Sequence, residues 1–237
     1  MGGGIQYSPA GRTRALNQSG NSNEDSRIEI MRQIGLLDSE RDPFFDCLPA
    51  FISPALNVPI SLVTMITSDC QFFKSSIGLP EPLKTRRCTS LSHSLCQHII
   101  LTGQPLIVAD ARKVSFLKDN PAVLDLNVVA YLGVPLRSAT GDRLGTLCAI
   151  DFVPHTWQMI DVTIIHAFAK VANAEIVLRT QAYNTGRLNP YIDESSEMYR
   201  AILELILMEC RTKVDLVHKL LAFAGSLLHS GVDNPQN

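Results

Sequence analysis

The stretch that decides the fold is "VVAYLGVPLRSATGDRLGTLCAID", residues 128–151. Two runs of apolar and β-branched residues, 128–138 and 143–151, flank the four residues "ATGD". Thr140-Gly141-Asp142 is typical of a tight turn, because glycine and short polar residues accept the backbone angles that turns need. The stretch is therefore predicted to be a β-hairpin.

Three further strands are expected upstream of this hairpin. "PISLVTMITS" (59–68) and "CQFFKSSIG" (70–78) follow each other across a Ser-Asp turn and should form a second hairpin. "QPLIVAD" (104–110) is a single apolar run. The first run is apolar on both faces of the alternation, which indicates a sheet covered on both sides.

Helices are predicted at both ends of this β-rich region. Apolar residues recur at helical spacing in 23–37 and 40–57, and again in a long helix over 156–184. Pro49 and Pro54 predict a kink or an early end in the second of these helices. The order predicts an α+β fold with helices mainly on one face of an antiparallel sheet. The long connections 79–103 and 111–127 should then roof a pocket on the other face.

The chain divides into three predicted parts. Residues 1–23 are rich in Gly, Ser and Asn and should form a disordered tail. Residues 24–184 form the folded domain, and residues 185–237 form a C-terminal helical extension with a short disordered tail. The extension has an apolar stripe expected to pair with a partner chain: Met198, Ile202, Leu205, Val214, Val217 and Leu221. We expect a homodimer, with a downstream signalling protein bound through residues 185–230.

Composition excludes several classes of partner. The 237 residues are 46% apolar, and 21 Lys plus Arg against 23 Asp plus Glu give a net charge of -2. That balance argues against a dedicated nucleic-acid binder. Neither a signal-peptide core nor a transmembrane-length apolar run is present in the sequence. We therefore expect a cytoplasmic protein with no membrane insertion, whose six cysteines form no disulfides.

"TSLSHSLCQHII", residues 89–100, holds the chemically most suggestive side chains. If 90–101 is a helix, His93 and Cys96 share a face, whereas Cys96 and His98 point apart and cannot share a metal. A helix that lines the pocket with His93, Cys96 or His98 is favoured over pigment attachment at Cys96 and over metal or catalytic use. We assign no metal, and the cofactor remains unknown.

Four other residues are candidate pocket contacts. Lys74 is interpreted as an exposed strand lysine or, alternatively, as a ligand contact. Asp110 and Arg112 are interpreted as a turn carboxylate and a solvated arginine rather than as an anion site. Tyr131 shares a strand face with Gly133 and should reach the pocket, where its hydroxyl needs a partner.

Several segments resemble the GAF domain family in their residues and in their order along the chain. They are "GLLDSERDPFFD", "NVPISLVTMI", "QFFKSSIGLP", "SHSLCQHII" and "GQPLIVADAR", followed by 128–151. The resemblance covers about residues 30–180. It implies a six-stranded antiparallel sheet, a ligand cavity on one face and a dimerising helical face. Because this family is functionally broad, the resemblance does not identify a ligand.

Three specialised activities of the family are not supported. The Asn-Lys-Phe-Asp-Glu type signature of cyclic-nucleotide binders is missing from the sequence. Bilin-binding members have a Cys followed directly by His, whereas Gln97 follows Cys96. Free methionine sulfoxide reductases use several clustered cysteines after the second strand, where this chain has Cys88 and Cys96.

The favoured prediction is a non-enzymatic sensory or regulatory protein that binds a small molecule or a partner and signals through its flanking helices. One alternative is a pigment or redox sensor working through Cys96. Another is a structural adaptor whose vestigial pocket is filled by side chains. An enzyme is least supported, because outside 93–98 the sequence offers no spaced nucleophile, base and orienting group.

Overall fold

The computed structural model describes residues 18–186. Its sheet has six strands in the order β3-β2-β1-β6-β5-β4, and every neighbouring pair is antiparallel. The strands are β1 (Ile60–Ile66), β2 (Cys70–Ile77), β3 (Cys88–Ser90), β4 (Leu106–Val108), β5 (Ala130–Arg137) and β6 (Arg143–Asp151). The predicted α+β fold with a six-stranded antiparallel sheet is confirmed.

The hairpin over 128–151 forms as predicted, with β5 and β6 as its arms. In its turn, the Ser138 amide donates to the Asp142 carbonyl and the Gly141 amide donates to the Ser138 carbonyl. Gly141 has a φ of 88°, which favours glycine over residues with a Cβ atom. β3 is the strand that the residue pattern does not reveal, because its sequence, Cys-Thr-Ser, contains no apolar run like the one that marks β4.

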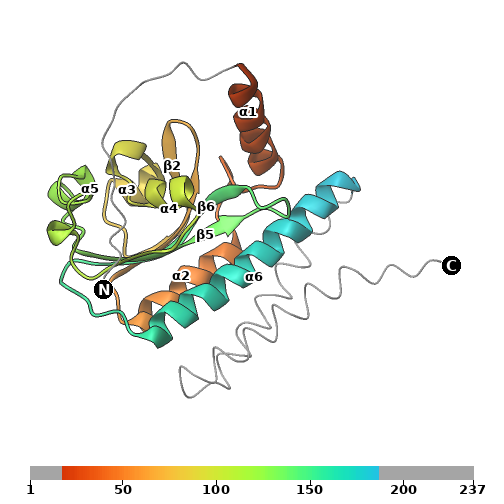
Figure 1. Cartoon of the computed structure of the whole chain (residues 1–237). Helices are drawn as coiled ribbons and strands as arrows, with labels where there is room; N and C mark the ends of the chain where they lie inside the picture. The colour runs from red at the N-terminus through yellow and green to blue at the C-terminus, as the bar shows by residue number, and fades with distance from the viewer. Residues whose placement is uncertain (1–17, 187–237) are drawn as a thin grey trace, which may run out of the picture.

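Figure 1 shows helices on both sides of the sheet. The long helices α2 (Pro43–Leu56) and α6 (Met159–Asn184) pack on one face, and α1 (Gln18–Gln33) joins the same core. The opposite face is covered by short helices, which we call the roof together with their connections: α3 (Leu83–Arg86), α4 (Cys96–Thr102) and α5 (Pro121–Leu124).

Alternation along the strands divides the buried side chains between these two faces. On β1, Val63 and Met65 belong to the core under α2 and α6, whereas Leu62 and Ile66 belong to the core under the roof. All of β1 is buried, since both of its faces are covered. This accounts for its unbroken apolar sequence.

Two predicted helix boundaries need correction. α1 begins at Gln18, so the boundary expected at residue 23 falls inside this helix. α2 continues through Pro49 and Pro54 to Leu56. Its end is set by Asn57, whose left-handed backbone (φ 54°) lets its amide donate back to the Pro54 and Ser53 carbonyls.

The segment 90–101 is not one helix. A 3-10 turn over Leu91–His93 precedes α4, which begins at Cys96. His93 and Cys96 therefore do not share one helical face. The Ser90 side chain accepts from the Ser92 amide and caps the 3-10 turn, which explains why serines interrupt the apolar pattern here.

The expectation of no disulfides is also wrong, because Cys70 and Cys88 are joined by one. The antiparallel pairing of β2 with β3 places their Cα atoms 6.4 Å apart. The two cysteines are 18 positions apart, and the sequence alone does not show this proximity. Cys47, Cys96 and Cys148 have free thiols.

The remaining predictions on the C-terminal extension lie outside the described residues, including Met198, Ile202, Leu205, Val214, Val217 and Leu221. None of the helices within 18–186 combines the length and the apolar character needed to cross a membrane.

Candidate functional site

A cavity of about 230 Å³ lies between the sheet and the roof. Strands β1, β2, β5 and β6 supply its floor, and the segments around α3, the 3-10 turn, α4 and α5 supply its walls. Most lining side chains are aliphatic, with the rings of Phe73 and Tyr131 among them. This is the pocket face that the order of elements predicts.

Polar side chains enter this cavity at a few places. Gln71 on β2 and Thr89 on β3 face each other across the strand pair. At another side of the cavity, His93 Nε2 lies 3.5 Å from an Asp125 carboxylate oxygen, and His93 Nδ1 lies 2.9 Å from Ser92 Oγ. His93 is therefore a wall residue engaged with Asp125 and Ser92.

Cys96 and Tyr131 meet at the base of the cavity. Cys96 Sγ lies 3.2 Å from the Tyr131 hydroxyl, and both residues are buried. The hydroxyl thus has the partner that its position demands, and that partner is a thiol from the roof.

The environment separates the proton affinities of the buried cysteines. A hydrogen bond with Cys148 lowers the pKa of Cys96; burial opposes this, and Thr146, Tyr131 and Thr64 lower it further. The hydrogen bond with Cys96 and burial together raise the pKa of Cys148. Burial is also the main reason that the pKa of Tyr131 is raised. Cys96 is thus the cysteine of this pair that more readily becomes a thiolate.

Gly133 leaves the space that Tyr131 occupies. A Cβ atom on Gly133 would lie 2.5 Å from the Tyr131 hydroxyl oxygen and 2.8 Å from Cδ1 of Ile99. The tyrosine side chain therefore lies over the bare backbone of its own strand, with Ile99 of α4 beside it. Gly133 is a position that shapes the cavity base, and the sequence pattern did not single it out for this role.

The other three candidates on the roof side do not line the cavity. His98 packs edge-on against Phe116, with ring centroids 5.2 Å apart, and burial lowers its pKa. Asp110 caps the 3-10 turn Ala111–Lys113 and accepts from the Arg112 side chain at 2.8 and 2.9 Å. Arg112 thereby lowers the pKa of Asp110 to about 2.

Lys74 lies on the opposite face of the sheet, which corrects both interpretations of it. It is only 1% exposed, and its Nζ donates to the Gly35 carbonyl at 2.7 Å and to Ser39 Oγ at 2.8 Å. The register between β1 and β2 shifts here, since Val63 pairs with Ser75 and Thr64 with Phe73. Lys74 is the residue without a counterpart on β1. Alternation after Phe73 already places it on the helical side, and the bulge keeps Ser75, which donates to Asp46, on that side as well.

Lys74 belongs to a buried group that we call the charge cluster: Asp42, Lys74, Glu175 and Arg179. Lys74 Nζ lies 3.1 Å from Asp42 Oδ2. Arg179 of α6 donates to both Asp42 oxygens, at 2.6 and 3.3 Å, and to Glu175 at 2.6 Å. The cluster joins the start of α2, strand β2 and the C-terminal half of α6.

The ionisable groups of this cluster have pKa values shifted in different directions. Burial raises the pKa of Asp42, but Arg179 and Lys74 together more than offset this and lower it. Burial lowers the pKa of Lys74 despite Asp42, and burial raises the pKa of Glu175 despite Arg179. With its three N–H groups directed at Gly35, Ser39 and Asp42, Lys74 has the geometry of an ammonium.

Sequence reasoning missed this cluster, although two signals pointed to it. Asp42 stands directly before Pro43, where a helix N-cap is expected, and Arg179 lies within a largely apolar helix. Neither signal shows that the two residues meet across 137 positions.

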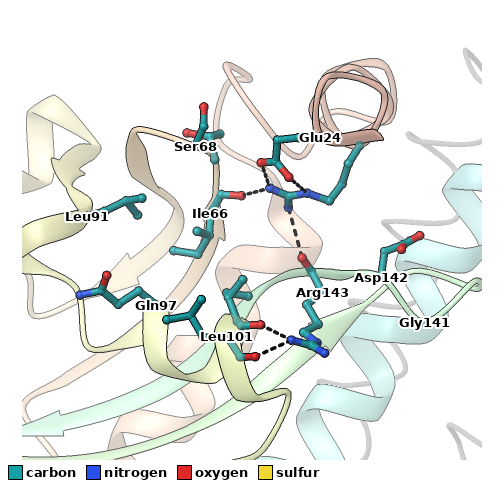
Figure 2. A pocket seen from close by; sticks show the side chains of 12 residues that line it. Glu24, Ile66, Ser68, Leu91, Gln97, Leu101, Gly141, Asp142 and Arg143 are labelled. Carbon is teal, nitrogen blue, oxygen red and sulfur yellow. Dashed lines mark hydrogen bonds and ion pairs between the residues drawn. The ribbon is translucent and has the colours of Figure 1, made fainter. Parts of the chain in front are cut away.

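A separate groove of about 480 Å³ lies where α1, the β1–β2 turn, α4 and the β5–β6 turn converge. Arg27 pairs with Glu24 and donates to the carbonyls of Ile66 (2.9 Å) and Arg143 (3.2 Å). Figure 2 shows these three partners around the groove. Arg143 in turn donates to the carbonyls of Ile100 and Leu101 at the end of α4. Both guanidinium groups are thus used to fasten elements together, and the groove is a structural junction.

Comparisons with known proteins agree with this architecture. The GAF domain family model matches residues 40–176, more than half of the chain. The chain belongs to the GAF domain family. GAF domains are typically sensory or regulatory modules, and the fold and the cavity described above agree with that membership.

A cyclic di-GMP phosphodiesterase of Pseudomonas aeruginosa is 33% identical to this GAF protein over 181 residues, which is 76% of the chain but 29% of the enzyme. The chain therefore corresponds to less than a third of that relative.

One solved structure shares the fold at low identity, and a second has a slightly lower score. The GAF domain of a phosphoenolpyruvate-protein phosphotransferase from Coxiella burnetii has a TM-score of 0.50 at 18% identity, covering 69% of this chain and 98% of that one. The corresponding Acinetobacter domain has a TM-score of 0.48 at 16% identity, covering 70% and 98%.

Proposed function

We propose that this GAF protein is a non-enzymatic sensor that binds a small molecule in the cavity under the roof and transmits occupancy to α6. The observation that supports this most strongly is the position of β2. This strand presents Gln71 and Phe73 to the cavity and Lys74 to the charge cluster on the other face. One strand therefore contacts both the ligand space and the group that holds α6.

The charge cluster is suited to transmit a small displacement. Its groups are almost fully buried, so their attraction is little screened by water. Arg179 holds Asp42 in a two-pronged contact, which is sensitive to the direction of approach. A ligand that shifts β2 would shift Lys74 and thereby alter the seat of α6, provided that it binds the two arrangements unequally.

The absence of enzymatic chemistry is part of the proposal. Cys96 is engaged with Tyr131, and His93 is engaged with Asp125 and Ser92, so these two are not a nucleophile and base pair. The related phosphodiesterase contains much sequence beyond the matched segment, and its name places it in signalling.

Output is proposed to pass through residues 185–230 to a partner protein, in a homodimer located in the cytoplasm. Because Arg179 must be kept to complete the charge cluster, removal of residues 187–237 should leave the domain folded but abolish partner capture. A truncated protein that still captures the same partner would contradict this output route.

Native mass spectrometry of the protein purified from its host tests the binding proposal. A reproducible non-covalent adduct of small mass, lost when the cavity is filled by Leu62→Trp, would support it. Bare protein that also takes up no small molecule added at millimolar concentration would contradict it and favour an adaptor with a vestigial pocket.

A second candidate is a redox sensor at Cys96, favoured by the lowered pKa of this thiol at the cavity wall. Its thiolate would attack one oxygen of a peroxide, forming an S–O bond while the O–O bond breaks and hydroxide leaves. Labelling of the resulting sulfenic acid by dimedone after peroxide treatment tests it. No label at Cys96 would exclude peroxide sensing at this residue.

A further inference from the structure

The side-chain oxygen of Gln71 is a buried polar atom without a protein partner in the described part of the chain. Gln71 is 4% exposed, and its Oε1 has no hydrogen-bond partner within residues 18–186. Buried amide oxygens are nearly always hydrogen-bonded in folded proteins, so each exception calls for an explanation. Here the side chain lines the cavity, where a bound molecule can supply the missing bond.

A second polar group lies beside it. Thr89 pairs directly with Gln71 across β2 and β3, and its side chain also lines the cavity. Directly opposed residues in an antiparallel pair have Cβ atoms about 4.5–5.5 Å apart on the same face. The amide offers both a donor and an acceptor, and the hydroxyl can act as either. Together they form a short polar strip along one wall of an apolar space.

The rest of the cavity restricts charge and size. Among residues 18–186, the lining includes no lysine or arginine, and its one carboxylate, Asp125, faces His93 and is about two-thirds exposed. A buried anionic group on a ligand would therefore lack a counter-charge, at high cost. The volume of about 230 Å³ is below the roughly 300–1,000 Å³ of pockets that hold drug-sized molecules. One or two fused rings are the appropriate size.

We infer that the cavity selects an uncharged, mainly apolar small molecule with one amide-like edge, a hydrogen-bond donor next to an acceptor, which pairs with Gln71 and Thr89. This ligand class rests on the proposed function, since it requires the cavity to be a binding site. A ligand edge with both a donor and an acceptor can pair with the Gln71 amide in either of its two flipped orientations.

Matched probes test the inference on the full chain. Oxindole has the required lactam edge, 1-methyl-oxindole lacks the donor, and indane lacks both polar groups. Affinities measured by ligand-observed NMR should favour oxindole over 1-methyl-oxindole by about tenfold, as expected for a buried hydrogen bond and the acceptor that it leaves unpaired.

Variants assign this preference to the polar strip. Gln71→Leu should remove the preference for oxindole while retaining indane binding, and Thr89→Val should reduce it. Gln97→Leu, at a glutamine on α4 that lines the groove rather than the cavity, is the matched control and should leave it unchanged. Because Gln71→Leu removes an unpartnered buried amide oxygen, the ligand-free variant should melt at a higher temperature than the wild type.

The outcomes distinguish failure of the proposed ligand class from failure of the proposed binding function. Binding of indane and both oxindoles with equal affinity would overturn the ligand class and leave the cavity as a binding site. Failure of all three probes to bind at millimolar concentration would overturn both. A lower melting temperature for Gln71→Leu would show that the amide has a structural partner, and would also overturn the inference.

Discussion

Gln71 and Lys74 lie three residues apart on β2 and point to opposite faces of the sheet. The Gln71 amide lines the cavity under the roof, and Lys74 Nζ lies 3.1 Å from Asp42 beneath the helices. Strand alternation sets this division, because residues an odd number apart point to opposite faces, and Phe73 lines the cavity together with Gln71. A displacement of β2 at the cavity thus reaches the charge cluster within the same strand.

Lys74→Met should destabilise the protein by about 3 kcal/mol, because it removes one partner of a buried charged group. The Gly35 carbonyl and Ser39 hydroxyl would lose the Lys74 donor, and Asp42 would keep Arg179 as its charged partner within the charge cluster. Chemical denaturation measures the change in unfolding free energy. Lys113→Met is the control: this lysine is 81% exposed and should change stability by less than about 0.5 kcal/mol. Equal effects of the two substitutions would show that the charge cluster contributes nothing.

The two carboxylates of the charge cluster should respond to pH with opposite signs. The lowered pKa of Asp42 means that its stabilisation is present above the unfolded pKa of about 3.9 and is lost as pH falls through its folded value. Asp42→Asn should therefore be most destabilising near neutral pH and lose its effect in acid.

Glu175 has a raised pKa, so its ionisation opposes folding as pH rises from its unfolded pKa of about 4.3 through the folded value. Glu175→Gln should gain stability relative to wild type over this interval. Unfolding free energies between pH 3 and pH 7 test both substitutions. Parallel pH profiles for the two variants would contradict the assignment of these pKa shifts.

Part of this architecture follows from sequence and part does not. The 128–151 hairpin is predictable because the turn residues and the strand residues lie together in the chain. Alternation also predicts that Gln71 and Lys74 point to opposite faces of β2, but it does not show which of these faces the long helices cover. It fails at Ser75, because the bulge at Lys74 leaves both residues on the helical face. The charge cluster is harder still, since Asp42, Lys74 and Arg179 meet only after the sheet and both long helices have assembled.

The order of helices and strands predicted the cavity, but only some of the side chains that line it were predicted. Tyr131 reaches it by simple alternation along β5. Cys96 reaches it because α4 begins there, although the preceding turn separates His93 from that helix. The sequence did not predict Gln71 as a cavity residue, because a glutamine in a strand is expected to be solvent-exposed. It is buried only because β3 and the roof cover this edge of the sheet.

Gly133→Ala should cost about 1–3 kcal/mol, as expected for overpacking a core. The new Cβ atom would lie 2.5 Å from the Tyr131 hydroxyl oxygen and displace it from Cys96. The same substitution in a Tyr131→Ala background should cost less, because the clash with the ring is removed. A double-mutant cycle by chemical denaturation measures this coupling. An equal cost in both backgrounds would locate the strain elsewhere.

Alkylation of Cys96 should reach half its maximal rate at a pH below about 8.5, the ordinary pKa of a cysteine, because the pKa of this thiol is lowered. Tyr131→Phe removes one of the groups that lower it and should move the midpoint upward. Mass spectrometry of iodoacetamide adducts at this residue gives the rates. A midpoint at or above that of free cysteine would contradict the assignment of a thiolate-stabilising site.

The most direct test of the proposed sensor is amide hydrogen exchange of the full-length protein with its cavity empty and filled. The comparison is made with and without saturating oxindole, or with the adduct found by native mass spectrometry. The account predicts that filling the cavity changes exchange in β2 and also in α6 around Glu175 and Arg179, and that Lys74→Met removes the α6 change while leaving the β2 change. Protection confined to the roof and β2 in the wild type, with α6 unaltered, would contradict transmission through the charge cluster.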